Sequence, residues 1–314
     1  MLAKQRRSPS RPDRAKDYMN SLPIWFLRVS HTQQLTPHMT RITLTGDDLR
    51  GFSLKEADQQ VKLYFPRPGQ SRPLLPEADG STDLTAWYQA YSALPEDERP
   101  WMRSYTIRAH DPASDSVSFD FVLHRHAGPA TRWAMNAEKG DCLAVFGPTD
   151  YFARPKPLSA SVEEADWVLL AGDDAAVPGM STIIEALPPG KRALAFVEVR
   201  DGADEQPFRT EGRLSTTWLH RGADEPGHSD ALADAVQAAD LPEGSGFAWI
   251  AGEAGIVRRL RRQLVARGMP KSRIDFSGYW RLKLTQDDAP TAEDLAEAQE
   301  RLAEAQAEAE GRVS

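Results

Sequence analysis

One short stretch of the chain, residues 103–108, brings together side chains that could bind a cofactor. Tyr105 and Thr106 stand on a predicted strand, with Arg103 before them and Arg108 after them. An aromatic face, a hydroxyl and two cations on one patch could hold a flat heteroaromatic ring and its phosphates, because guanidinium groups pair well with phosphate oxygens. The stretch therefore predicts a site for a flat ring that carries phosphates.

The next strand alternates between apolar and polar side chains over residues 117–124. This period of two is typical of a half-buried antiparallel strand. Phe119 and Phe121 belong to the apolar face, whereas Asp120 and His124 belong to the mostly polar face. We expect the polar face to point toward the same ligand as residues 103–108.

Short strands dominate the first half of the chain. We predict them at residues 24–29, 40–45, 61–65, 103–108, 117–124 and 142–146. One helix is expected at 130–137, and residues 66–100, rich in Pro, Gly, Ser and acid, predict a long excursion outside the core. This pattern favours a six-stranded antiparallel barrel with the limits 21–155.

Beyond residue 155 the pattern changes to apolar strands that alternate with helices. Continuous apolar runs, of the kind buried on both faces of a parallel sheet, are predicted at 167–172, 194–199, 217–219 and 247–252. Helices are predicted at 178–187 and 230–239, and an amphipathic helix follows residue 252. Alternating strands and helices predict a doubly wound parallel sheet, here within 160–283.

Composition and charge exclude several kinds of protein. A single cysteine, Cys142, among 314 residues allows no internal disulfide and no all-cysteine metal or iron–sulfur site. The formal charge of −8 argues against general nucleic-acid binding. No apolar run is long enough to cross a bilayer or to act as a secretory signal, so we expect a cytoplasmic protein without stable membrane insertion. A disordered basic tail over 1–20 and an acidic helical extension over 284–314 complete the predicted organisation.

Several motifs resemble those of one family when they are taken in order. They are R-x-Y-T-x-R at 103–108, D-F-V-L-H at 120–124 and G-P-A-T-x-W-A at 128–134, followed by blocks at 171–178, 251–253 and 277–281. In this order they resemble the siderophore-interacting proteins, the ViuB-like ferric-siderophore reductases, which belong to the ferredoxin-reductase-like flavoproteins. The resemblance implies an FAD-binding barrel followed by an NAD(P)-binding-type sheet domain.

The resemblance also implies roles for individual residues. Arg103 should meet the FAD pyrophosphate, Tyr105 should lie along the isoalloxazine, and Thr106 should donate to its redox-active edge. His124 and the start of the helix at 130 should hold the diphosphate and adenine end. The complete set of expected FAD contacts is Arg103, Ser104, Tyr105, Thr106, Asp120, Val122, His124, Gly128, Pro129, Ala130, Thr131, Asp173, Asp174, Ala175, Ala176 and Trp280.

Some of these residues have a plain structural alternative. Arg103 and Arg108 could form ion pairs at the barrel edge, and Trp280 could close the core instead of covering the flavin. Asp173 and Asp174 would repel a phosphate at the turn where a wound sheet binds one. Arg200 could favour a phosphorylated ribose or be merely solvated, and the solvated state is the expected one.

The remaining sites concern the electron donor and the substrate. No G-x-G-x-x-G motif is present in the second half, so NADH, NADPH and reduced ferredoxin all stay open as donors. Glu253 is the candidate on the nicotinamide side. Lys62, Arg132 and Arg281 are the candidates for an anionic ferric siderophore, and no resident metal site is expected.

The function implied is an FAD-dependent ferric-siderophore reductase that passes electrons from NAD(P)H to Fe(III). No covalent catalyst is needed, because the cofactor carries the chemistry and the protein supplies position and electrostatics. Two alternatives stay open, a generic flavin reductase or diaphorase and a siderophore-binding protein without redox activity. We expect a monomer whose partners are a ferric siderophore and, as one option, ferredoxin.

Overall fold

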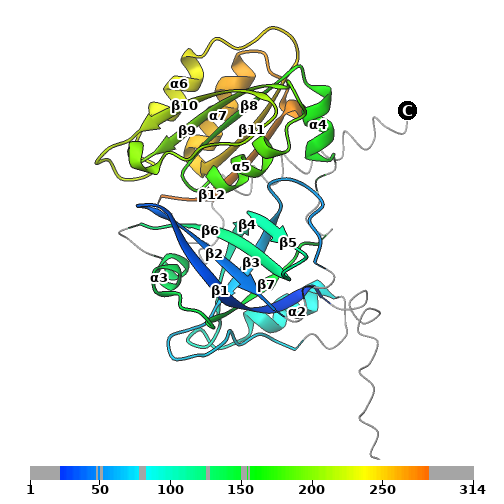
Figure 1. Ribbon diagram of the computed structural model, residues 1–314, viewed down its shortest axis with the longest axis vertical. Coiled ribbons are helices and arrows are strands. Elements are labelled where there is room, and N and C mark those ends of the chain that lie inside the picture. The colour runs from blue at the N-terminus through cyan, green and yellow to red at the C-terminus, as the bar shows by residue number, and fades with distance from the viewer. Residues whose placement is uncertain are drawn as a thin grey trace, which may run out of the picture.

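The computed structural model describes residues 22–46, 49, 52–77, 83–124, 128–149, 154 and 156–282. The predicted basic tail at 1–20 and the predicted acidic extension at 284–314 lie outside the described residues. Two domains are stacked along the long axis, with the first domain below and the second above in Figure 1. In the described part of the chain, no helix is both long enough and apolar enough to cross a membrane.

The first domain is a curled antiparallel sheet with the strand order β4-β3-β7-β1-β2-β6-β5. Its strands are β1 (Ile24–Thr36), β2 (Met39–Thr45), β3 (Gln60–Phe65), β4 (Trp101–Thr106), β5 (Ala109–Asp111), β6 (Ser116–Val122) and β7 (Cys142–Phe146). The sheet therefore has seven strands where six were predicted. The additional strand, β5, pairs with the neighbouring strand β6. It has three residues, which are too few to show a clear periodic pattern in the sequence.

The sheet closes on itself through its aromatic side chains. The rings of Tyr105 on β4 and Phe121 on β6 lie 4.5 Å apart between centroids, although these strands are far apart in the sheet order. Phe119 and Phe121 are fully buried, as the alternation predicted. Asp120 on the opposite face is also buried, because Arg41 on β2 covers it.

Among the described residues, two helices accompany the barrel, α2 (Leu84–Ser92) and α3 (Pro129–Asn136). Only α3 was predicted, so the expectation of a single helix was wrong. Asp83 caps α2 by accepting the N–H groups of Thr85 and Ala86 at 2.9 and 3.0 Å. Trp87 and Tyr91, one turn apart, then pack on the outer face of the barrel. This cap and this spacing were signals that the Pro-rich surroundings obscured.

The second domain is a parallel five-stranded sheet with the order β10-β9-β8-β11-β12. Its strands are β8 (Trp167–Asp173), β9 (Arg192–Val199), β10 (Arg213–His220), β11 (Gly246–Glu253) and β12 (Ile274–Trp280). Its helices are α4 (Leu158–Glu164), α5 (Val177–Glu185), α6 (Ala231–Ala238) and α7 (Ala254–Ala266), with short 3₁₀ turns η3 (Gly202–Asp204) and η4 (Lys271–Arg273). The predicted doubly wound sheet is thus confirmed.

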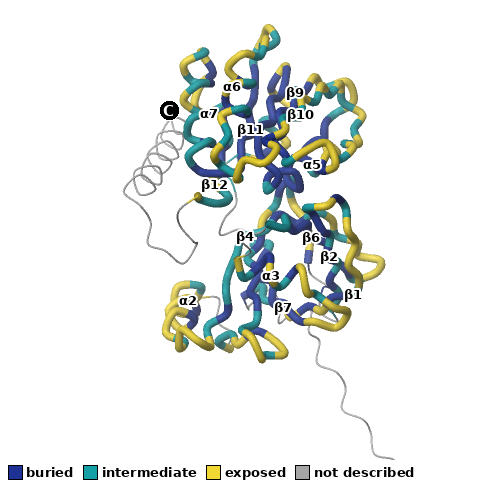
Figure 2. The backbone as a smooth tube through the Cα atoms, turned by 90° about the vertical axis from the view of Figure 1, so that its left-hand side faces the viewer, coloured by how far each residue is buried: buried dark blue, intermediate teal, exposed yellow. Residues whose placement is uncertain are grey.

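The helices cover both faces of this sheet. Side chains of α4 and α5 belong to one apolar core, and side chains of α6 and α7 belong to the other. Every residue of the two central strands, β8 and β11, is buried, as Figure 2 shows for this part of the second domain. The first of these cores also includes Met39 from β2, so the apolar contact continues from one domain into the other.

The strand order creates a switch point between β8 and β11. The chain runs outward from β8 to β10 and then returns to the other side of β8, so connections leave these two neighbours in opposite directions. Ligands of such sheets bind outside the carboxyl ends of the strands at this point. Gly172 belongs to this end, and a Cβ there would lie 2.4 Å from the Ala176 Cβ and 2.5 Å from the Ala251 oxygen. Only glycine allows this close approach.

Candidate functional site

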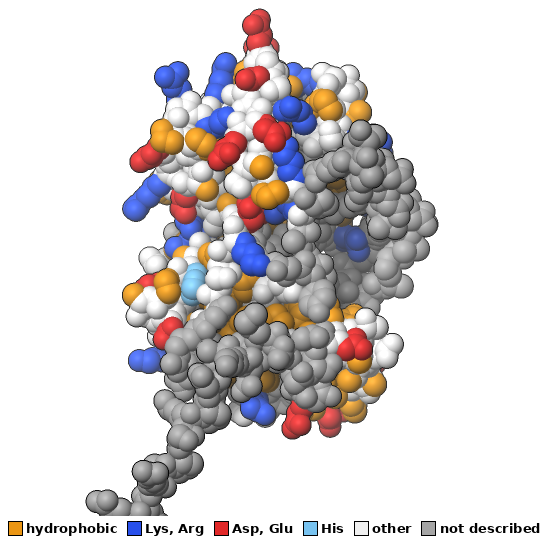
Figure 3. Space-filling model, turned by 90° about the vertical axis from the view of Figure 1, so that its right-hand side faces the viewer, with side chains coloured by type: hydrophobic (Ala, Val, Ile, Leu, Met, Phe, Trp, Pro, Cys, Tyr) orange, Lys and Arg blue, Asp and Glu red, His pale blue; other side chains and the backbone are white. Residues whose placement is uncertain are grey.

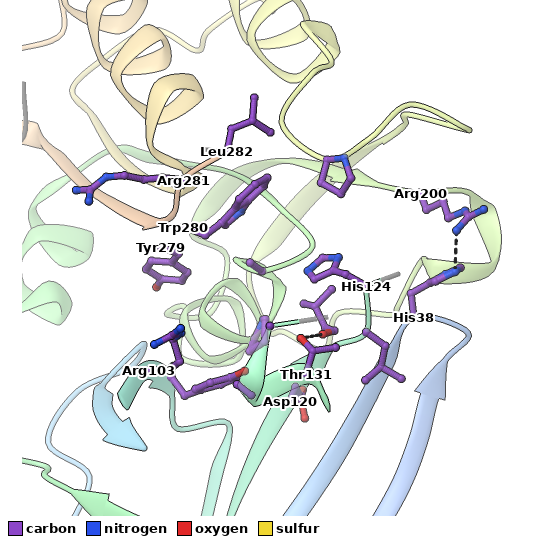
Figure 4. Close-up of a pocket in the computed structure, with 18 of the residues that line it drawn as sticks. His38, Arg103, Asp120, His124, Thr131, Arg200, Tyr279, Trp280, Arg281 and Leu282 are labelled. Atoms are coloured by element: carbon purple, nitrogen blue, oxygen red, sulfur yellow. Dashed lines mark hydrogen bonds between the residues drawn. The ribbon is translucent and has the colours of Figure 1, made fainter. Parts of the chain in front are cut away.

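A cavity of about 1450 Å³ lies between the two domains. The barrel contributes β4, the end of β6 and the start of α3, and the sheet domain contributes the end of β12 and the loops after β9 and β10 (Figure 4). Arg103 and Trp280 enter it from opposite domains. The predicted site residues that line it are Lys62, Arg103, Ser104, Tyr105, Thr106, Asp120, Val122, His124, Gly128, Pro129, Ala130, Thr131, Ala175, Trp280 and Arg281.

Strand β4 forms the wall where the aromatic and hydroxyl groups converge. Tyr105 packs on Phe121 beneath it, and burial raises the pKa of the Tyr105 phenol well above its usual range, so the ring is neutral. Thr106 follows it and is buried. Arg103 Nη1 donates to the Met102 carbonyl at 2.7 Å. A flat ring would find here an apolar surface with hydroxyl groups beside it.

Lys62 on β3 reaches the same wall from the neighbouring strand, where it is paired with Ser104 in the register of β3 and β4. Its Nζ donates to Ser104 Oγ at 2.6 Å. Burial lowers the pKa of Lys62 from its ordinary value, because few water molecules are left to solvate the ammonium. An anionic ligand in the cavity would stabilise the charged form of this lysine.

Asp120 lies in the cavity wall but is already engaged with cations. Arg41 Nε and Nη2 donate to its two carboxylate oxygens at 2.6 and 2.8 Å, and Arg108 Nε lies 3.9 Å away. Arg108 also donates to both carboxylate oxygens of Glu185 on α5. The structure therefore assigns Arg108 to ion pairs that join the barrel to the sheet domain, the alternative considered from the sequence.

The start of α3 opens toward the cavity and suits an anion. Gly128 is its N-cap and provides no side-chain cap, Pro129 follows at the first helical position, and a Cβ on Gly128 would meet nothing within 4 Å. Thr131 Oγ1 donates to the Val122 carbonyl at 3.2 Å, which fixes this turn on β6. The N–H groups of a first helical turn bind phosphate well. With the ring surface of β4, this donor set fits FAD.

Histidines and arginines occupy the far end of the cavity. Burial lowers the pKa of His124, with the nearby Arg221 adding to the effect and Asp174 opposing it. His38, in the β1–β2 turn, lies 2.8 Å from Asp204 Oδ2 through Nδ1 and 3.2 Å from Arg200 Nη1 through Nε2. Figure 4 shows His38 and Arg200 at the same end of the site.

Arg200 is thus a cavity residue in contact with the barrel and is not merely solvated, so that expectation was wrong. Sequence reasoning missed His38, Arg221, Tyr279 and Leu282, which also line the cavity. Arg200 and Arg221 directly follow β9 and β10, so the strand order contained a signal for them. No local signal pointed to His38, because its place depends on how the two domains meet.

The acids of the switch point lie behind the cavity wall. Asp173, Asp174, Ala176 and Glu253 do not belong to the lining. Asp174 accepts from buried Arg221 at 2.6 Å, and this pairing offsets the repulsion expected between the acidic turn and a phosphate. Glu253 caps α7 by accepting the Ile256 N–H at 2.9 Å. Their carboxylates organise the strand ends instead of facing a ligand.

Of the three cations considered for an anionic substrate, Lys62 and Arg281 line the cavity, whereas Arg132 is exposed on α3 outside its lining. On the face shown in Figure 3, outside the grey atoms, Lys and Arg side chains of the second domain are interspersed with Asp and Glu. That part of the surface carries charges of both signs. The cations inside the cavity are therefore better candidates for binding an anionic substrate than the cations on this surface.

The comparisons with known proteins cover both domains. A family model for the siderophore-interacting FAD-binding domain matches residues 28–151, and one for the siderophore-interacting protein matches residues 165–283. Ferric vibriobactin reductase ViuB of Vibrio cholerae is 32% identical over 250 residues, which cover 79% of this chain and 85% of that protein. The NADPH-dependent ferric-chelate reductase of Escherichia coli is 28% identical over 280 residues, which cover 88% of this chain and 99% of that protein.

A solved structure agrees with these matches. The siderophore utilization protein from T. fusca superimposes with a TM-score of 0.70 at 32% identity, covering 85% of this chain and 97% of that one. The two matched segments follow each other in the order of the barrel and the wound sheet. The chain belongs to the siderophore-interacting protein family.

Proposed function

We propose that this protein is an FAD-dependent ferric-siderophore reductase that takes electrons from NAD(P)H and passes them to Fe(III). The observation that carries the proposal is the interdomain cavity, which combines a ring-binding wall on β4, an anion-binding helix start on α3 and cations beside them. Relatives named as ferric reductases support the reaction class. The proposed domain limits are 21–155 for the FAD-binding barrel and 160–283 for the sheet domain.

Each wall of the cavity would hold one part of FAD. Tyr105 and Thr106 would meet the isoalloxazine, and Arg103 with the first turn of α3 would meet the pyrophosphate. His124, kept neutral by burial, would lie toward the adenine end. When bound, FAD supplies the redox chemistry that links a two-electron donor to a one-electron acceptor such as ferric iron. The protein's part is to orient the ring, keep water from it and leave one edge accessible.

Lys62 and Arg281 would attract a bulky anionic chelate to that edge, and Arg132 would add charge outside the cavity. The buried ammonium of Lys62 gains most from such a ligand, because burial lowers its pKa in the absence of a negative charge. Glu253 would act on the nicotinamide side only indirectly, through the α7 cap. Arg200 and Arg221 are better placed for the phosphates and ribose of a dinucleotide, since they follow β9 and β10.

The proposal also includes the electron donor, the cellular compartment and the oligomeric state. NADPH and NADH are the donors of first choice, and reduced ferredoxin is the alternative. We place the reaction in the cytoplasm and expect a monomer.

An anaerobic titration of the purified protein tests the function. The protein should be yellow, the flavin should be bleached by one of the three donors, and a ferric siderophore should restore the colour while a ferrous-specific dye traps Fe(II). Lys62→Met should raise KM for ferric siderophore several-fold, whereas Lys139→Met, at an exposed position, should not. Faster turnover of quinones than of ferric siderophores would identify a diaphorase. Tight chelate binding without Fe(II) would identify a binding protein.

A further inference from the structure

Asp173 holds together the strand ends behind the cavity. It is the last residue of β8, is 5% exposed and accepts three N–H groups. Its Oδ1 accepts from the Ala175 backbone at 3.0 Å, and its Oδ2 accepts from the Glu253 backbone at 2.9 Å and from the Trp280 indole Nε1 at 2.8 Å. Asp173 therefore connects the ends of β8, β11 and β12, although it does not line the cavity itself.

Trp280 does line the cavity, and its ring is confined on two sides. The Asp173 carboxylate holds the nitrogen edge of the indole. Gly227, in the loop after β10, lies so close to the six-membered ring that a Cβ there would be 3.0 Å from Trp280 Cη2. The position of the ring is thus set by two contacts, one at the end of β8 and one in the loop after β10, before any ligand is bound.

The backbone around Asp173 is shaped to admit its carboxylate. Gly252 has a φ of +136°, and a Cβ at this position would lie 2.6 Å from Asp173 Oδ2. Burial and the neighbouring Asp174 raise the pKa of Asp173 to about 7, while the three N–H donors oppose that rise. A buried carboxylate is unfavourable unless it is well hydrogen-bonded. Of the three hydrogen bonds that Asp173 accepts, the bond from the Trp280 indole is the one that comes from the side chain of a cavity residue.

We propose that Asp173 is a positioning residue, which fixes the indole of Trp280 as a wall of the cavity so that the ring can pack against the bound flavin. This inference rests on the proposed function only in naming FAD as the ligand. Without the bond, the indole could rotate away from the wall, and FAD binding would have to restrict that rotation. FAD affinity should then fall, and the flavin should be quenched less by the indole.

Two variants remove the same bond from opposite sides: Asp173→Ala removes the acceptor, and Trp280→Phe removes the donor. In each, the dissociation constant for FAD, measured with flavin-depleted full-length protein, should rise about tenfold, the range expected for a hydrogen bond to a charged group. Asp173→Ala should also increase bound-flavin fluorescence and shift the Trp280 indole N–H resonance, which is assigned by its loss in Trp280→Phe. The double variant should bind FAD no more weakly than Trp280→Phe alone, because the shared bond is already lost.

Trp249→Phe is the matched control. Its indole Nε1 donates to buried Asp58 at 2.7 Å, the same kind of bond, and neither residue lines the cavity. This variant should lower stability but leave FAD affinity within about twofold. If Asp173→Ala lowers stability but leaves FAD affinity and flavin fluorescence unchanged, the proposal is overturned. It is also overturned if Asp173→Ala weakens FAD binding as much in the Trp280→Phe background as in the wild-type protein. A protein that binds FAD but reduces no ferric chelate would refute the proposed function and leave this role of Asp173 intact.

Discussion

Arg154 is the residue whose loss should most clearly destabilise the contact between the two domains. Its Nη1 and Nη2 donate to the Asp58 carboxylate of the barrel at 2.9 and 2.6 Å, and its Nε donates to Asp275 on β12 at 2.6 Å. The Asp58 side chain is 1% exposed and also accepts from the Trp249 indole. Arg154→Met would leave this buried carboxylate with the indole as its remaining side-chain partner.

Arg154→Met should lower the free energy of unfolding by a large amount, and this loss should depend on pH. Removing one partner of a buried ion pair typically costs about 3–5 kcal/mol, and the Arg154 side chain is 32% exposed, so we expect the lower end, about 3 kcal/mol. Burial raises the pKa of Asp58 while Arg154 opposes it, so the variant should raise this pKa further. The variant's loss should therefore be greater at pH 8 than at pH 5, where Asp58 can take up a proton.

Urea unfolding of the wild-type protein and of Arg154→Met, each at pH 5 and at pH 8, measures this loss of stability. Arg259→Met is the matched control, because Arg259 pairs with Asp230 and Asp234, whose side chains are 73% and 66% exposed. Exposed pairs contribute about 1 kcal/mol or less. Adding Asp58→Asn to Arg154→Met should recover part of the loss at pH 8. Equal losses for the two arginine variants, or a loss independent of pH, would refute the reasoning.

Three further predictions concern stability. Gly172→Ala should lower the free energy of unfolding by roughly 2–3 kcal/mol, because its Cβ would meet the Ala251 oxygen at 2.5 Å; Gly202→Ala, whose Cβ has its nearest neighbour at 3.8 Å, should be close to neutral in the same urea experiment. The raised pKa of Asp173, about 7 against 3.8, means that the native state binds the proton more tightly than the unfolded state. Wild-type stability should therefore fall by up to about 4 kcal/mol relative to Asp173→Asn as pH rises from 4 to 8, and parallel stability curves would contradict this. Asp83→Ala should cost about 1 kcal/mol through loss of the α2 cap, and an unchanged melting temperature would count against that cap.

Local patterns were enough to predict most of the elements. Period-two alternation predicted β6, and the apolar run at 142–146 predicted β7 with the bounds that the structure has. Alternating strands and helices predicted the doubly wound sheet, because a strand buried on both faces needs helices to cover it. The wall on β4 was also predicted, since Arg103, Tyr105 and Thr106 are neighbours on one strand and need no distant contact to lie together.

Tertiary structure decided which polar groups face the ligand and which stay behind the wall. The motif at 171–178 suggested that Asp173 would approach FAD, but its carboxylate is turned to the ends of β11 and β12. His38 and Arg200 are 162 positions apart and meet only because the β1–β2 turn reaches the loop after β9. A side chain's local sequence determines its type and the element that carries it. Its partner depends on how sheets and domains pack, because hydrogen bonds and ion pairs form between groups that the chain brings close only after folding.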